Sequence, residues 1–256
     1  MRPTGLLSVT FRALPFERIV ELAAQAGLDG IEWGGDRHLP PGDLTHAAAI
    51  GKATKNAGLT NFAYGSYWRC DREPEMIAET AAALGAQWIR VWAGTLPSAE
   101  CPPEIRRRTV EYLRDLCRRC RGALQVAAEW HCNTLTDDAA SAVRLLDEVG
   151  EDNFFCYFQQ GDDLLAERDD LRALIQLPPE RIRAVHVNCC VKRERLPLAA
   201  GAEEWSRLFA HIPESVPALL EFVRGDSIEQ YLEDAATLKK LTAPAPKHTK
   251  PQNTRG

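Results

Sequence analysis

Short apolar runs alternate with amphipathic segments along almost the whole chain. The apolar runs are rich in residues that favour strands, and they cover 5–11, 28–34, 59–66, 86–94, 123–131, 153–160, 181–190 and 216–223. In the segment after each run, apolar residues recur every three or four positions, which is typical of a helix with one buried face. The pattern therefore predicts eight strand–helix units.

Turn and cap residues mark the expected helix ends. The predicted helices cover 15–27, 44–58, 73–85, 102–122, 136–150, 164–176, 201–212 and 227–241. Several of them stop at a glycine, which readily takes the left-handed conformation that ends a helix. Asp43 is placed to cap the second helix, and Ser227 with Gln230 forms a capping-box pattern at the start of the last one.

Strands that alternate with helices imply right-handed crossovers and a parallel sheet. Eight such units in 256 residues favour a single (β/α)8 TIM barrel over an open sheet. No glycine-rich phosphate loop follows any strand, which argues against a nucleotide-binding sheet. We expect one domain over residues 1–242 and a disordered polar tail over 243–256.

Composition narrows the class of protein further. Apolar residues make up 45% of the chain, and the net charge is −5, so no basic field favours nucleic acid as a partner. The first residues contain no long apolar run, so we expect no export signal, no membrane span and a cytoplasmic location. In that setting the eight cysteines are expected to be free thiols, including Cys117 and Cys120 within a predicted helix.

Four polar residues stand at the carboxyl ends of the last four predicted strands: Glu129, Gln159, His186 and Glu221. In a TIM barrel these ends meet at one mouth, where the active site lies. A carboxylate inside an apolar run is costly to bury unless it is paired or metal-bound. Two carboxylates, an imidazole and an amide oxygen would suit Mn²⁺, Co²⁺, Mg²⁺ or Zn²⁺.

Further polar and aromatic side chains follow the predicted strands and would face the same mouth. These candidate substrate contacts are Glu32, Trp33, His38, Ser66, Trp92, His131, Asn188 and Lys192. The aromatic members offer a stacking surface for a sugar ring. For each of them, a role in core packing or as an ordinary loop residue is an open alternative.

The segments GIEWGGDRHLPPGD, AAEWHCNTLTD, AVHVN and LLEFVRGDSIEQYL carry a family resemblance. From about residue 5 to 240 the chain resembles the xylose isomerase-like TIM-barrel superfamily of sugar isomerases and epimerases. The resemblance implies metal ligands of the types Glu, Asp, His and Glu on strands five to eight. Glu129, His186 and Glu221 match three of these, whereas the Asp position falls on Gln159. Glutamine keeps an oxygen ligand but removes one negative charge.

The resemblance also implies a reaction. It is proton transfer next to a carbonyl through an enediolate, with Glu129 and Glu221 on opposite faces of a sugar or keto-polyol and with Mn²⁺ as the first choice of metal. A keto-polyol dehydratase on the same site is a close variant. Two rivals stay open: a non-catalytic sugar-binding barrel, which Gln159 supports, and an abasic-site endonuclease, which the acidic balance and six histidines disfavour. A homo-oligomer is a further expectation from the family.

Overall fold

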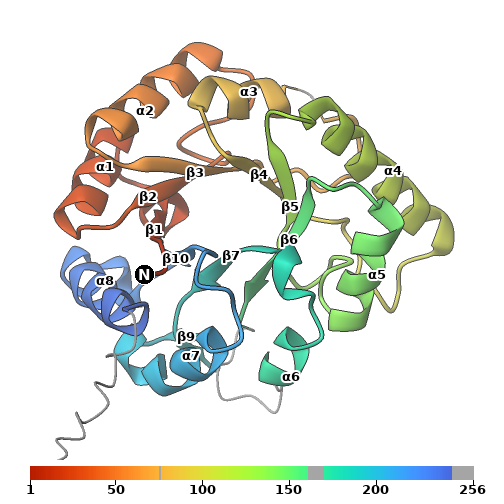
Figure 1. Ribbon diagram of the computed structural model, residues 1–256. Helices are drawn as coiled ribbons and strands as arrows, with labels where there is room; N and C mark the ends of the chain where they lie inside the picture. Colours follow the sequence, from red (N-terminus) through yellow and green to blue (C-terminus); the bar gives the residue numbers. More distant parts are fainter. Residues whose placement is uncertain (75, 161–169, 244–256) are drawn as a thin grey trace, which may run out of the picture.

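Parallel strands close into a barrel with helices around it (Figure 1). The computed structural model describes residues 1–74, 76–160 and 170–243. The barrel strands are β1 (Thr4–Leu7), β2 (Gly30–Gly34), β3 (Thr60–Gly65), β4 (Trp88–Val91), β5 (Gln125–Ala128), β6 (Phe154–Gln159), β7 (Ile182–Val187) and β10 (Ala218–Leu220). They follow one another around the barrel in chain order, and β10 pairs with β1 to close it. The predicted (β/α)8 TIM barrel is confirmed.

Helices occupy the connections and lie outside the barrel (Figure 1). They are α1 (Phe16–Gln25), α2 (Leu44–Asn56), α3 (Ile77–Leu84), α4 (Pro103–Cys120), α5 (Ala139–Val149), α6 (Asp170–Leu174), α7 (Ala202–Phe209) and α8 (Ile228–Leu241). The first half of the predicted helix 164–176 lies outside the described residues. So does the predicted disordered tail, apart from Ala243.

Two local features differ from the sequence prediction. The first strand stops at Leu7, and Ser8–Phe11 forms a 3-10 turn, η1. The Ser8 hydroxyl accepts a hydrogen bond from the Gly34 amide at 2.9 Å, so a side chain replaces strand pairing there. In addition, a small hairpin of β8 (Cys190–Val191) and β9 (Glu194–Arg195) follows β7 at the barrel mouth.

The predicted helix caps form. Asp43 Oδ1 accepts from the backbone N–H of His46 at 2.9 Å, and Ser227 Oγ accepts from that of Gln230 at 3.2 Å. The Gln230 side chain donates to Asp234 instead of returning to the backbone of Ser227, so only half of the capping box is present.

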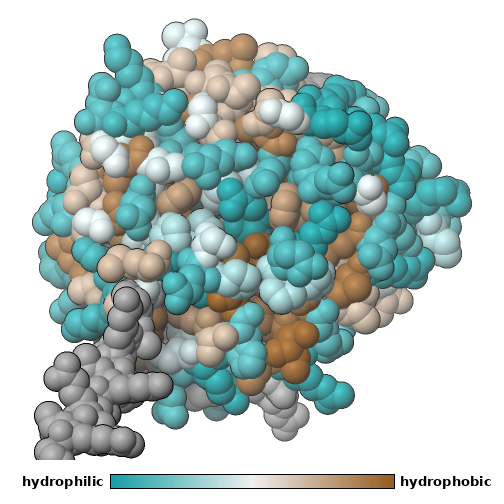
Figure 2. Space-filling model, in the orientation of Figure 1, coloured by the Kyte–Doolittle hydropathy of each residue, from teal (hydrophilic) through white to brown (hydrophobic). Residues whose placement is uncertain are grey.

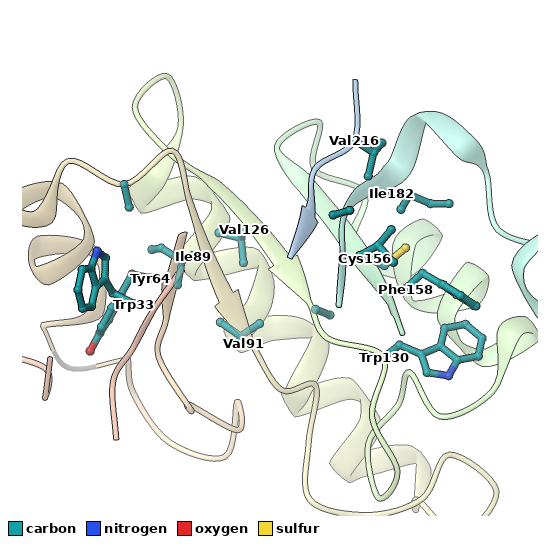
Figure 3. Packing of buried hydrophobic residues seen from close by; sticks show 14 of the residues in the cluster. Trp33, Tyr64, Ile89, Val91, Val126, Trp130, Cys156, Phe158, Ile182 and Val216 are labelled. Carbon is teal, nitrogen blue, oxygen red and sulfur yellow. The ribbon is translucent and has the colours of Figure 1, made fainter. Parts of the chain in front are cut away.

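The apolar side chains form two cores. The larger one lies between the barrel wall and the helices, and Figure 3 shows part of it, including Trp33, Tyr64, Ile89 and Phe158. The smaller one consists of buried residues contributed mainly by alternate barrel positions: Phe62, Ala63, Trp88, Ala127, Tyr157, Ala184 and Leu219. Side chains alternate between the two faces of a strand. The position of a residue in this alternation, which we call its parity, therefore decides which core it joins.

Parity places three large side chains of one segment inside the barrel. Trp88 donates to the hydroxyl of Tyr157, while Arg90 and Trp92 both donate to the carboxylate of Glu129. The neighbouring strand leaves room for Arg90, because a Cβ on Gly65 would lie 2.5 Å from its Nη2 atom. The lack of a side chain at Gly65 therefore lets a guanidinium occupy the centre of the barrel.

Hydrophilic residues cover most of the face seen in Figure 2, with smaller hydrophobic areas between them. Among the residues that the structure describes, no helix combines the length and the apolar character needed to cross a membrane.

The close approach at Gly65 yields a first prediction. Gly65→Ala would push a methyl group against buried Arg90, and overpacking of this kind costs about 1–3 kcal/mol of unfolding free energy. Urea denaturation would measure the loss. Gly58→Ala is the control, because nothing lies within 4 Å of its added Cβ and only the left-handed backbone is strained. An equal loss in both variants would show that the contact with Arg90 is unimportant.

Candidate metal and substrate site

His186 on β7 is the centre of the site. Strand register places it beside Gln159 of β6 on one side and Leu219 of β10 on the other. Its ring is fully buried, and its Nδ1 atom lies 3.1 Å from Gln159 Oε1 and 3.3 Å from Glu129 Oε1. Glu221 Oε2 is 3.6 Å away. The four residues singled out on the last four barrel strands therefore meet around one nitrogen.

These side chains fit a divalent cation. Glu129, His186 and Glu221 are all buried, and each offers one ligand atom within 4.8 Å of the other two. The oxygen of Gln159 lies on the same side of the imidazole and completes a set of one nitrogen and three oxygens. Such a mixture suits borderline-hard ions such as Mn²⁺, Co²⁺ or Zn²⁺.

The other ring nitrogen of His186 faces a carboxylate. Its Nε2 atom is 3.5 Å from Glu32 Oε2 on β2, and it has no hydrogen-bond partner within the described chain. Glu32 is also fully buried and accepts a hydrogen bond from the Tyr157 hydroxyl at 2.7 Å. A metal-binding histidine commonly has a carboxylate behind it, which orients the ring and makes the ligand nitrogen more basic.

Arg90 bridges two of the buried carboxylates. Its Nε atom donates to Glu32 Oε1, its Nη1 atom donates to Glu129 Oε2, and the side chain is 2% exposed. Burial alone would lower the pKa of Arg90, but Glu129 and Glu32 raise it well above its ordinary value. Burial likewise disfavours ionised Glu129, yet Arg90 and then His186 bring its pKa well below the usual range. The pair is therefore a buried ion pair with both partners charged.

The net charge of this centre is negative. Three carboxylates, Glu32, Glu129 and Glu221, face one guanidinium, so a neutral His186 leaves two uncompensated negative charges. The same imbalance acts on His186 when no cation is bound: burial lowers its pKa, but Glu221 and Glu32 raise it to about 10, so the ring is protonated. A cation at Nδ1 would take the place of that proton and leave the ring neutral. A single divalent cation would neutralise the cluster, and the site therefore matches such an ion in charge as well as in ligand type.

A cavity of about 390 Å³ opens above these residues. Glu129, Gln159 and Glu221 form part of its lining, together with Trp92, His131 and Asn188 from the predicted substrate contacts. The rings of Trp92 and His131 lie 4.6 Å apart and form one wall. The volume of the cavity is in the usual range for small-ligand sites.

Four predicted substrate contacts lie elsewhere. Trp33 is in the outer core and donates to Asn61 Oδ1, because its parity on β2 is opposite to that of Glu32. His38 packs against Trp33 and binds the Leu14 carbonyl, and Ser66 donates to the Arg90 carbonyl. Lys192 is exposed in the β8–β9 turn, outside the cavity lining. No substrate contact is proposed for these four.

Glu32 also lies apart from the cavity lining, beneath His186, so its predicted substrate contact becomes a supporting contact to the imidazole.

Sequence reasoning missed Arg90, Arg12, Arg195 and Phe222, which also line the cavity. A signal existed for Arg90, because a charge inside the apolar run 86–94 is as costly to bury as the glutamates that were singled out. No comparable signal marked Arg195, since it depends on a hairpin that the pattern did not predict.

Gln160 lines the cavity with a buried amide. Its side chain is 5% exposed, and neither amide atom has a hydrogen-bond partner among the described residues. Buried polar atoms are usually paired, so this amide is available to a bound ligand.

Comparison with solved structures shows the same fold in several enzymes. A probable 3-DHS dehydratase from Bacillus anthracis has a TM-score of 0.72 at 20% identity, with 94% of this chain and 98% of that chain covered. A 3-keto-D-glucoside 4-epimerase from E. coli scores 0.71 at 17% identity, covering 94% and 99%. A D-psicose 3-epimerase crystallised with D-fructose scores 0.68 at 14% identity, covering 94% and 99%.

No curated protein matches the chain. A family model described as a xylose isomerase-like TIM barrel matches residues 20–241, which is most of the sequence. The chain therefore belongs to the xylose isomerase-like TIM barrel family.

Proposed function

We propose that the protein is a divalent-metal-dependent isomerase or epimerase of a sugar or keto-polyol. The observation that supports this most is the meeting of Glu129, Gln159, His186 and Glu221 around one point beneath a ligand-sized cavity. Manganese is the first choice of metal. A bound cation would supply Lewis-acid stabilisation of the negative charge that develops when a carbon next to a carbonyl loses its proton.

The two glutamates differ in how firmly they are held. Glu129 Oε2 accepts hydrogen bonds from Arg90 and Trp92, which leaves Oε1 directed to His186 and the cation position. The Glu221 carboxylate makes no hydrogen bond within the described residues, and it lines the cavity from a strand three positions around the barrel. Glu221 is thus the freer group to accept a substrate proton, with Glu129 oriented to act on the opposite face.

Dehydration of a keto-polyol is the second candidate reaction. It shares the first step, removal of a proton next to a carbonyl, and one similar structure is a probable dehydratase. Two other similar structures are epimerases, which is why epimerisation leads. At 14–20% identity these structures support the fold and a sugar-type substrate class more than a particular reaction.

Gln159 supports a rival hypothesis from another functional class, a non-catalytic sugar-binding barrel. Its oxygen retains the ligand position, while the missing charge weakens attraction for the cation. Gln160 supports substrate binding in either case, because its unpaired amide faces the cavity. The formation of a homo-oligomer by this protein is still a prediction.

The metal site can be tested by substitution. Gln159→Asp adds a charge beside His186 Nδ1 and should tighten Mn²⁺ binding on the order of tenfold, whereas His186→Ala should abolish it. Calorimetry on chelator-stripped protein would measure both. Asn188→Asp is the matched control, since it adds the same charge to the cavity lining at a side chain that has no hydrogen bond or ion pair with His186 among the described residues. Equal tightening in the two Asp variants would mean that Gln159 is not a ligand.

Catalysis can be tested through proton exchange. Glu129→Gln and Glu221→Gln should each lower solvent-deuterium uptake by ketoses by roughly 10²-fold or more, because each removes a proton-transfer group. Nuclear magnetic resonance would follow the exchange, and circular dichroism would check the fold. Glu203→Gln, at an exposed position on α7, should have no effect. Full exchange by either buried variant would refute the assigned role.

Arg90 provides a test that does not depend on turnover. Arg90→Met would leave Glu32 and Glu129 buried without their counter-charge, which typically costs about 3–5 kcal/mol. Arg118→Met removes an exposed partner of Glu151 and should cost about 0–1 kcal/mol. Urea unfolding of both variants would give the two values. Similar small losses would show that the buried carboxylates do not need Arg90.

A further inference from the structure

A second cavity of about 330 Å³ adjoins the candidate site. We call it the outer chamber and the cavity above His186 the inner chamber. The two share three lining residues, Arg12, Arg195 and Phe222. The rest of the outer chamber comes mainly from the η1 turn and the loop after it, and from the start of α8. It includes the apolar residues Val9, Phe11, Leu14 and Ile228.

The three shared residues form a partition at the boundary between the two chambers. Both guanidinium groups lie near the Phe222 ring, with Arg195 Cζ 4.2 Å and Arg12 Cζ 5.8 Å from its centre. The Phe222 backbone has φ +56°, a left-handed conformation that a bulky residue seldom takes. The Phe222 amide donates to Thr10 Oγ1 at 3.1 Å, which helps to hold this conformation. The ring is therefore held directly beside Glu221.

The charges of the outer chamber are already balanced. Arg12 Nε is 2.6 Å from Asp36 Oδ2, and Arg195 Nη1 is 2.7 Å from Asp226 Oδ1. A phosphate would need uncompensated positive charge, and neither arginine supplies it.

The nearby start of α8 does not favour a phosphate either. Ser227 already caps this helix, and Glu229 lies in its first turn. The combination of balanced charge, apolar walls and a capped helix suits an uncharged ring.

We propose that the outer chamber binds a neutral ring substituent of the substrate, so that the enzyme prefers glycoside-type keto-sugars to free or phosphorylated ones. This inference rests on the proposed function for the inner chamber. The keto ring would lie above His186, and the substituent would pass the Arg12–Phe222–Arg195 partition. Hydroxyls of the second ring would find donors in the two guanidinium edges, and its apolar face would contact Val9, Phe11 and Leu14.

Ala13 gives a clean way to block the outer chamber. It is exposed, lines the outer chamber and is not part of the inner lining. Ala13→Trp should fill the space with little effect on folding, and Ala13→Ser is the matched control. The probes are a free 3-keto-aldohexose, which we call the free ketose, its phenyl glycoside, which keeps the ring ketone, and its 6-phosphate ester. Each is titrated by calorimetry into the manganese-loaded full chain.

We expect the phenyl glycoside to bind on the order of tenfold more tightly than the free ketose. Ala13→Trp should remove that gain and leave binding of the free ketose unchanged, while Ala13→Ser should keep the gain. A phenyl glycoside that binds no better than the free sugar would overturn the proposal. So would a larger gain for the phosphate ester, or a gain that survives Ala13→Trp.

Solvent-deuterium exchange, measured on the same samples, separates this inference from the proposed function. A glycoside gain that Ala13→Trp removes, without exchange on any probe, would support the outer chamber and contradict proton transfer. Exchange on the free ketose without any gain for the glycoside would support proton transfer and contradict the outer chamber.

Discussion

The bridge from Arg90 to Glu32 and Glu129 is the interaction on which the site depends. All three side chains are buried inside the barrel, where an unpaired charge is very costly. Arg90 keeps both glutamates ionised and turns one oxygen of each toward His186. It does so from β4, whereas Glu32 is on β2 and Glu129 follows β5, so the bridge links β4 to its neighbour β5 and, across β3, to β2.

The negative charge that Arg90 only partly neutralises explains why the mouth of the barrel suits a cation. Glu32 lies behind the imidazole, and Glu129 and Glu221 lie in front of it. A carboxylate on both sides of His186 makes this point in the barrel attractive to a cation. Among the described residues, the inner chamber is lined by the two front carboxylates and not by Glu32, so an ion held there would face a ligand bound in that chamber. Metal binding and substrate binding are therefore expected to share Glu129, Gln159 and Glu221.

The alternation of strands and helices was enough to predict the barrel, and strand ends were enough to predict its four central residues. Prediction failed where side-chain parity was ignored. Glu32 and Trp33 are adjacent, but one faces His186 and the other faces the helices. Prediction also failed where the chain departs from the repeated unit. The hairpin after β7 and the η1 turn after β1 depend on long-range contacts, such as the Ser8 bond to Gly34, which periodicity does not encode.

The pairing of His186 with Gln159 across β6 and β7 has a consequence for assembly of the fold. Side chains on a strand alternate, so a slip of one residue would turn the imidazole out of the barrel and bring Val185 or Val187 into its place. Only the native alignment brings Gln159 and His186 together as proposed ligands, so only that alignment could gain free energy from a bound ion. The proposed cation would therefore favour the native register of β6 and β7 over shifted registers, acting as a check on how these two strands align.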